Sequence, residues 1–338
     1  MASTTPEGAQ NLEVVPLRHY GRWLGVVAAL IAVAMIIHTI FSKIPTQTGQ
    51  VVCHVSNGVK VCHPLMLWRF SWDVVGQFFF SSEILQGLWL TLQLTAISMV
   101  VGVSIGVIVA IMRLSPNRVL SGTAWVYTWF FRGTPVIVQL AFWFSLHLVY
   151  PQLTLGIPFL PITFLHIDTT TLFTPYLAAL VVLALNEGAY MSEIVRSGLI
   201  SVDEGQIEAA TSIGMTRAQT LRLVILPQAM RVTIPPTGNE VISMLKTSSI
   251  ASTVSVLELF GVQGLIAGGN YEIIPLLITA SLWYIVVTTV LSIGQFYLER
   301  HYAKGSLRTQ PLTPIQRLRR DAKGIAGKFR TPRPAVTR

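Results

Sequence analysis

The sequence predicts an all-α integral membrane protein with six transmembrane spans, and three observations support this fold class. Only 12% of the 338 residues are charged, about half the usual share in soluble proteins. Hydrophobic residues make up 52% of the chain. Nearly uncharged stretches that are long enough to cross a bilayer recur along it. These values exclude a disordered protein and disfavour an ordinary two-domain soluble enzyme.

Residues 23–41 form the first predicted span, because they contain no Asp, Glu, Lys or Arg and follow Arg18 and Arg22. At a rise of 1.5 Å per residue, this stretch covers about 28 Å, close to the thickness of the hydrocarbon core. A cleaved signal peptide is the alternative, since residues 32–34 resemble a cleavage site. The apolar stretch continues to Phe41, so we favour an uncleaved anchor.

Five further apolar stretches follow the first one. They cover roughly residues 84–112, 134–150, 175–195, 232–251 and 276–298. Pro135 and Pro175 suit the first turn of their helices, where the missing N–H costs little. Gly102 and Gly106 form a GxxxG pattern, which permits the close approach of a neighbouring helix. Residues 116–130 carry tryptophan and tyrosine beside apolar positions, which is typical of an interfacial segment.

Basic residues in the loops orient these spans. With the N-terminus in the cytoplasm, the inside segments hold 19 of the 24 Lys and Arg residues, and the outside loops hold 3. The positive-inside rule therefore predicts a multi-pass protein with both termini in the cytoplasm. We expect the basic C-terminal tail to contact acidic membrane lipid. Aromatic residues do not alternate with the basic ones along the tail, so we expect no nucleic-acid partner.

The outside loop 42–83 contains both cysteines, Cys53 and Cys62. Asn57-Gly58 between them is a strong signal for a two-residue hairpin turn. In that register Cys53 lies opposite Cys62, at a separation that a disulfide can bridge. We therefore predict a disulfide in this oxidising compartment, with two free thiols as the alternative. A metal site that adds the histidine after each cysteine is disfavoured, because adjacent strand residues point to opposite faces.

The inside segment 196–231 is too long to be a simple connector. Glu208-Ala209-Ala210 is followed by Gly214 and then, after nine residues, by Val224-Ile225-Leu226-Pro227. Alanine and glutamate favour a helix, and Gly214 suits its C-terminal end. Thr216 is suited to cap a second helix. The sequence therefore predicts a helix, a glycine turn and a second helix, which project into the cytoplasm and dock on another protein.

The spacing E-A-A-x3-G-x9-aliphatic-x-L-P resembles the signature of permease subunits of bacterial ABC importers. Further stretches resemble, more narrowly, the polar amino-acid uptake group of histidine, glutamine and arginine type permeases. They are GLWLTL at 87–92, FRGTP at 131–135, EGAYMSEIVR at 187–196, and NE through KTSS at 239–249. The resemblance covers about residues 84–300. Residues 23–41 and the cysteine loop are additions to the usual five-span subunit of that family.

The resemblance implies a type I ABC importer transmembrane domain in a bacterial cytoplasmic membrane. Two permeases would pair as a homodimer or heterodimer, above two ATPase subunits, and an extracytoplasmic binding protein would deliver the substrate. This chain would bind no cofactor and would not be an enzyme, since the partner ATPase would use ATP and Mg. The loop 201–227 would couple ATP hydrolysis to transport. Its coupling residues would be Glu208, Ala209, Ala210, Gly214, Leu226 and Pro227.

This interpretation divides the chain into five parts. They are a cytoplasmic N-terminus (1–22), an additional span (23–41), an extracytoplasmic loop (42–83), the permease domain (84–300) and a basic cytoplasmic tail (301–338).

Ionisable residues inside predicted spans are candidates for function. Counting along the helices places Glu187 about 18 Å from the outer end of its span and Glu240 about 14 Å from the inner side. Both therefore lie near the midplane of a core about 30 Å thick. We expect Pro235-Pro236 to interrupt the fifth span just before Glu240.

The functional interpretation of these charges is a translocation cavity for a zwitterion such as an amino acid. Carboxylates would meet its ammonium group, and Lys246 with polar side chains would meet its carboxylate. A buried Glu–Lys pair that fixes helix packing is an equal alternative. Arg132 is interpreted as an inner-interface residue that reaches the headgroups. The predicted pathway comprises Asn186, Glu187, Tyr190, Asn239, Glu240, Ser243, Lys246 and Thr247.

An autonomous channel or an ion-coupled secondary transporter is the alternative function. That class needs internal repeats or helices broken at matching positions of two halves, and the sequence offers one interrupted span and no clear repeat. The chain has no HExxH or GxxxxGK[ST] motif. We therefore expect neither a membrane enzyme nor ATP hydrolysis by this chain itself.

Overall fold

The computed structural model of the protein describes residues 20–45, 51–56, 59–64, 66–68, 71–150, 152–156, 163–169 and 174–302. The chain forms two compact units, residues 1–74 and 75–338, and each is described by itself. The predicted cytoplasmic N-terminus and basic tail lie almost entirely outside the described residues.

The first unit begins with α1 (Tyr20–Ile40), at the position of the first predicted span. The side chains from Gly25 to Thr39 are all exposed. A helix that is apolar on every side is typical of a segment surrounded by lipid.

Two antiparallel strand pairs follow α1. The first joins β1 (Lys43–Pro45) to β4 (Met66–Trp68), and the second joins β2 (Val51–Ser56) to β3 (Val59–Pro64). Within the second pair, Cys53 lies directly opposite Cys62, as the hairpin register predicted. The side chains of this hairpin lie outside the described part of the chain, so the disulfide itself stays a prediction.

The second unit is helical apart from one strand pair. Its α-helices, with α2 at its beginning, are α2 (Trp72–Phe79), α3 (Ser82–Arg113), α4 (Arg118–Gly133), α5 (Val136–Val149), α7 (Pro175–Ile200), α8 (Glu204–Ser212), α9 (Arg217–Thr220), α10 (Leu226–Thr247), α11 (Leu259–Asn270) and α12 (Ile273–Tyr302). A π-helical turn, η1 (Leu221–Ile225), precedes α10, and a 3-10 segment, η2 (Ser248–Val254), follows it. The strands β5 (Gln152–Gly156) and β6 (Thr163–Asp168) pair between α5 and α7.

Three helices of the described residues are long and apolar enough to cross a membrane, namely α3, α7 and α12. The segment from α9 through η2, together with α11, gives a fourth span if the pair, bent by 45°, is one broken span. Helices α1 and α5 lie at predicted spans but have shorter apolar stretches. The chain is therefore a multi-pass membrane protein whose spans are helical.

The GxxxG pattern brings α3 and α7 into close contact, as predicted. A Cβ atom at Gly102 would lie 2.7 Å from the Cβ atom of Glu187, and one at Gly106 would lie 2.5 Å from that of Met191. Real Cβ atoms do not approach so closely, so both positions require glycine for this packing. This contact fixes the depth and direction of the Glu187 side chain.

The prediction that Pro235-Pro236 interrupts the fifth span was wrong, because α10 continues through both prolines to Thr247. Each proline removes one backbone donor from the helix. The carbonyls freed by the two prolines are those of Arg231 and Val232, four residues earlier. Side chains nearby add bonds to the helix backbone: Thr233 donates to the Ala229 carbonyl at 2.9 Å, and Gln295 of α12 donates to the Pro235 carbonyl at 3.5 Å. Membrane helices tolerate proline where neighbouring helices pack around it.

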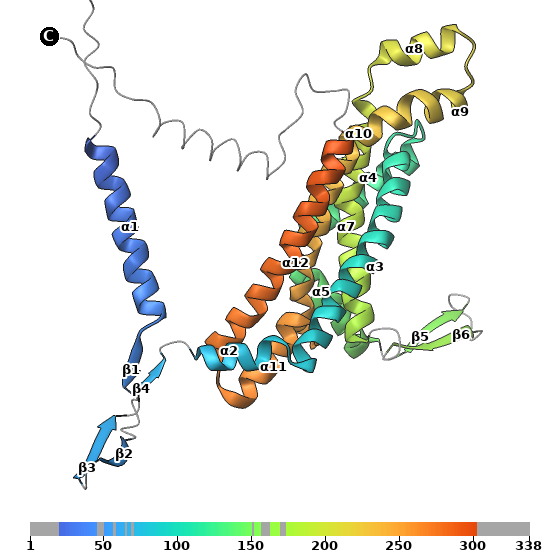
Figure 1. Cartoon of the computed structure of the whole chain (residues 1–338). Coiled ribbons are helices and arrows are strands. Elements are labelled where there is room, and N and C mark those ends of the chain that lie inside the picture. The colour runs from blue at the N-terminus through green and yellow to red at the C-terminus, as the bar shows by residue number, and fades with distance from the viewer. Residues whose placement is uncertain are drawn as a thin grey trace, which may run out of the picture. The chain divides into compact units, whose positions relative to one another are not determined.

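Figure 1 shows the direction in which the 201–227 loop leaves the second unit. Helices α8 and α9 extend beyond the ends of α7 and α10, whereas α2 and α11 lie at the opposite end of the bundle. The loop that carries the E-A-A signature is thus a projection and not a part of the helical core.

Candidate functional site

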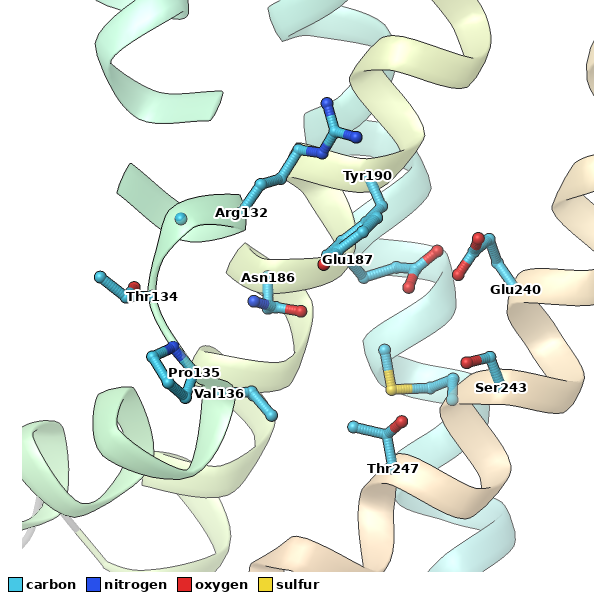
Figure 2. Close-up of a pocket in the computed structure, with 12 residues that line it drawn as sticks. Arg132, Thr134, Pro135, Val136, Asn186, Glu187, Tyr190, Glu240, Ser243 and Thr247 are labelled. Atoms are coloured by element: carbon cyan, nitrogen blue, oxygen red, sulfur yellow. The ribbon is translucent and has the colours of Figure 1, made fainter. Parts of the chain in front are cut away.

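A cavity of about 560 Å³ opens between α4, α5, α7 and α10. Figure 2 shows its lining side chains. They are Arg132, Gly133, Thr134, Pro135, Val136, Asn186, Glu187, Tyr190, Glu240, Ser243, Met244 and Thr247. These residues come from helices far apart in the sequence, and only packing of the whole bundle brings them together.

The cavity contains most of the residues that the sequence predicted for a substrate pathway. The predicted residues that line it are Asn186, Glu187, Tyr190, Glu240, Ser243 and Thr247. Asn239 and Lys246 do not line it, and both are exposed on α10. Ser243 and Thr247 follow Glu240 by three and seven residues, so they share its face of α10 and line the cavity with it. Asn239 and Lys246 lie seven residues apart on the adjoining face. The predicted face of Asn239, Ser243 and Lys246 thus contributes only Ser243.

Arg132 is the cavity residue that the sequence interpretation placed elsewhere, at the membrane interface. Its guanidinium carbon lies 5.2 Å from the ring centroid of Tyr190, within the range of a cation–π contact. In Figure 2 it extends from the end of α4 beside Tyr190 and Glu187. The signal that could have found it is the adjacent Gly133-Thr134-Pro135, which ends one helix and starts the next inside the bundle.

Two side-chain amides hold this break between α4 and α5. Asn186 of α7 donates to the Phe131 carbonyl at 2.9 Å. Gln139 of α5 donates to the same carbonyl at 3.0 Å and to the Thr134 hydroxyl at 2.8 Å. The carbonyls freed at the end of a helix are thereby satisfied. Asn186 consequently positions the cavity wall in addition to lining it.

Glu187 is the most deeply placed charge of the cavity. Its side chain is 3% exposed, and its Oε1 atom has no hydrogen-bond partner among the described residues. Glu240 approaches it from α10 on the facing wall. A buried carboxylate oxygen without a donor is costly. The arrangement therefore offers two carboxylates to a cation, with the Arg132 guanidinium nearby to attract an anion.

The 201–227 loop forms the predicted helix, glycine turn and second helix. Asp203 caps α8 by accepting from the Gly205 amide at 2.9 Å. Helix α8 ends before Gly214, whose φ is +84°. Thr216 then caps α9 in a capping box with Gln219. The three signals that predicted this unit all have local causes, which explains why sequence reasoning sufficed.

The predicted coupling residues divide into exposed and buried ones. Glu208 and Ala209 are exposed on α8, and Leu226 and Pro227 are exposed at the start of α10. Ala210 is buried, with 4% exposure, and its carbonyl accepts from the Met215 amide at 3.1 Å.

Sequence reasoning missed the most exposed apolar side chain of the loop. Ile213 lies at the tip of α8 with 79% exposure. Because it adjoins the exposed face of Glu208 and Ala209, it offers an apolar contact for a partner protein.

Comparisons with known proteins agree with one another. Residues 102–304 match the family described as binding-protein-dependent transport system inner membrane component. The arginine transport system permease protein ArgU of Corynebacterium glutamicum is 43% identical over 300 residues, which are 88% of this chain and 85% of ArgU. The L-cystine transport system permease protein TcyB of Bacillus subtilis is 37% identical over 231 residues, covering 68% of this chain and 90% of TcyB.

A solved structure extends this likeness to three dimensions. The crystal structure of an amino acid ABC transporter with histidines matches with a TM-score of 0.58 and 32% identity. The match covers 68% of this chain and 98% of that chain.

Proposed function

The chain belongs to the binding-protein-dependent transport system inner membrane components, as the permease subunit of an ATP-driven amino-acid importer, and we propose that its substrate is a cationic amino acid of the arginine type. The chain is not itself an enzyme, because ATP hydrolysis in such importers belongs to a separate subunit. It acts in the bacterial inner membrane as a multi-pass protein.

The observation that carries the substrate proposal is the buried, unpartnered Glu187 carboxylate oxygen beside Glu240. A guanidinium or ammonium side chain supplies the donors that this oxygen lacks. Arg132 on the same cavity wall complements the substrate's α-carboxylate. The similarity to ArgU, an arginine transport system permease protein, supports the same class of substrate.

The test is the substrate profile of Glu187→Gln and Glu240→Gln. We expect each change to weaken arginine uptake at least tenfold and to affect uptake of a neutral amino acid much less, because only the cation needs the lost charge. Glu299→Gln is the matched control, since Glu299 is a carboxylate of α12 that does not line the cavity. Equal losses for cationic and neutral substrates in correctly folded variants would instead indicate a structural carboxylate pair.

The cytoplasmic partner in this proposal is the ATPase, which uses ATP and Mg and docks on the 201–227 loop. The exposed side chains of Glu208, Ala209 and Ile213 support a protein partner at that projection. An extracytoplasmic binding protein delivers the substrate on the other side.

A second permease, identical or homologous, is the other proposed partner. Asn239 and Lys246 support it, because they are exposed on α10 within the predicted span, where polar groups avoid lipid. A second subunit over this face shields both of them.

The proposed topology has six spans and two cytoplasmic termini. The distribution of Lys and Arg supports this orientation. The five predicted parts, with the permease domain at 84–300, remain our proposal for the domain organisation. No observation favours an autonomous channel or an ion-coupled transporter.

A further inference from the structure

A second cavity lies where the start of α10 meets the end of α12. It has a volume of about 470 Å³. Arg222, Arg231 and His301 form its basic part, and Leu226, Met230 and Tyr302 contribute apolar surface. No residue that lines it is acidic. The cavity is separate from the one that contains Glu187, since the two share no lining residue.

Among the described residues, no ion pair neutralises the positive charge of this cavity. Both ion pairs found among the described residues involve Glu193, so neither uses Arg222 or Arg231. The nearby Glu299 accepts a hydrogen bond from Gln295 at 2.8 Å and does not line the cavity. Uncompensated arginines in a concave site attract anions.

The cavity lies at the depth of the lipid headgroups. The apolar stretch of α12 ends at Leu298, and Glu299, Arg300 and His301 follow. Leu226 and Met230 are both exposed beside the arginines. A ligand that has an anionic head and apolar chains complements both halves of this surface, whereas a soluble anion uses only the basic half.

The C-terminal tail of the chain is unsuited to this site by its charge. Residues 304–338 contain ten Lys and Arg residues and a single acid, Asp321. Like charges would repel the tail from the two arginines. The same basic composition draws acidic lipid toward this end of the protein.

We propose that this cavity binds the headgroup of an anionic phospholipid from the cytoplasmic leaflet. Arg222 belongs to η1, the turn that joins the cytoplasmic loop to α10, and His301 belongs to α12. A bound headgroup therefore links the end of the loop to α12. Its influence on ATPase coupling rests on the proposed function, but lipid binding itself does not.

The experiment measures the lipid that the full chain retains when it is purified with its ATPase in nanodiscs of phosphatidylcholine and phosphatidylglycerol. We expect native mass spectrometry to show bound phosphatidylglycerol. Arg222→Gln and Arg231→Gln should each lower its retention roughly fivefold, the effect of one basic contact near a membrane surface. Arg118→Gln is the matched control, because Arg118 is an exposed arginine at the start of α4 outside the cavity.

The experiment includes one further variant and one competitor. Met230→Glu places a negative charge in the cavity from an exposed position, and it should also release the lipid, even if an arginine variant misfolds. Inorganic phosphate is added as a competitor. Retention that is equal in all variants and the control, or displacement of the lipid by inorganic phosphate, would overturn the proposal.

Discussion

Gly214 shows how a single residue shapes the 201–227 loop. It is the one glycine with positive φ among the described residues, and nothing lies within 4 Å of the position where a Cβ would stand. Glycine is therefore required at this position for its backbone conformation and not because a side chain would lack space. A non-glycine residue at this φ costs roughly 1–2 kcal/mol, and asparagine is better tolerated than a β-branched residue.

We expect Gly214→Val to distort the turn and to reduce substrate uptake, and Gly214→Asn to retain most of it. The physical reason is that valine resists the left-handed region, whereas asparagine adopts it. Uptake and ATPase pull-down, measured for both variants at equal membrane levels, check this. If Gly214→Val binds the ATPase and transports as well as Gly214→Asn does, the glycine turn has no role in coupling.

Glu187, Arg132 and Lys246 mark the limit of prediction at the scale of residues. The depth of Glu187 followed from helix rise alone, and the structure places it in the cavity. The positions of Arg132 and Lys246 depend on helix rotation and on the break after α4, which are set by contacts with α7. Such contacts are not local, so a single sequence does not reveal them.

At the scale of elements, α8 carries two neighbouring alanines with different roles. Ala209 is exposed and Ala210 is buried. The sequence analysis predicted the same coupling role for both, because the E-A-A spacing does not indicate which face of the helix packs against the rest of the chain.

We expect Ala209→Trp to abolish ATPase binding while the permease stays folded, since the large ring occupies the partner's contact surface. Ala210→Trp should instead destabilise the loop itself, because Ala210 is already packed. Ala209→Ser is the conservative control and should bind the ATPase normally. Pull-down together with size-exclusion profiles separates these cases, and normal ATPase binding by Ala209→Trp would argue against docking at this face.

The spans at α3, α7 and α12 and the two helices of the loop followed from the sequence, because their signals are local, namely apolar length, caps and one glycine. The continuous path of α10 could not be predicted from such local signals. Pro235 and Pro236 predict a break, yet α10 continues through both and packs against α7 and α12. Tertiary contacts outweighed a local rule at this element.

At the scale of the whole molecule, the first unit adds a helix and two antiparallel strand pairs to the permease. Opposition of Cys53 and Cys62 across an antiparallel pair allows a disulfide. We expect mass spectrometry of a nonreduced digest of the membrane protein to show one peptide pair linked through these cysteines. Two thiols that react with an alkylating reagent in nonreduced protein would contradict this prediction.

The central claim concerns the complete importer, in which this chain moves a cationic amino acid only when its partners supply energy and substrate. The most direct measurement is uptake of labelled amino acids into vesicles that contain this chain, its ATPase and its binding protein. The account predicts arginine uptake that requires ATP and both partners, that exceeds uptake of neutral amino acids, and that falls in Glu187→Gln. Uptake by this chain alone, or ATP-driven uptake that prefers neutral amino acids and is unchanged in Glu187→Gln, would contradict it.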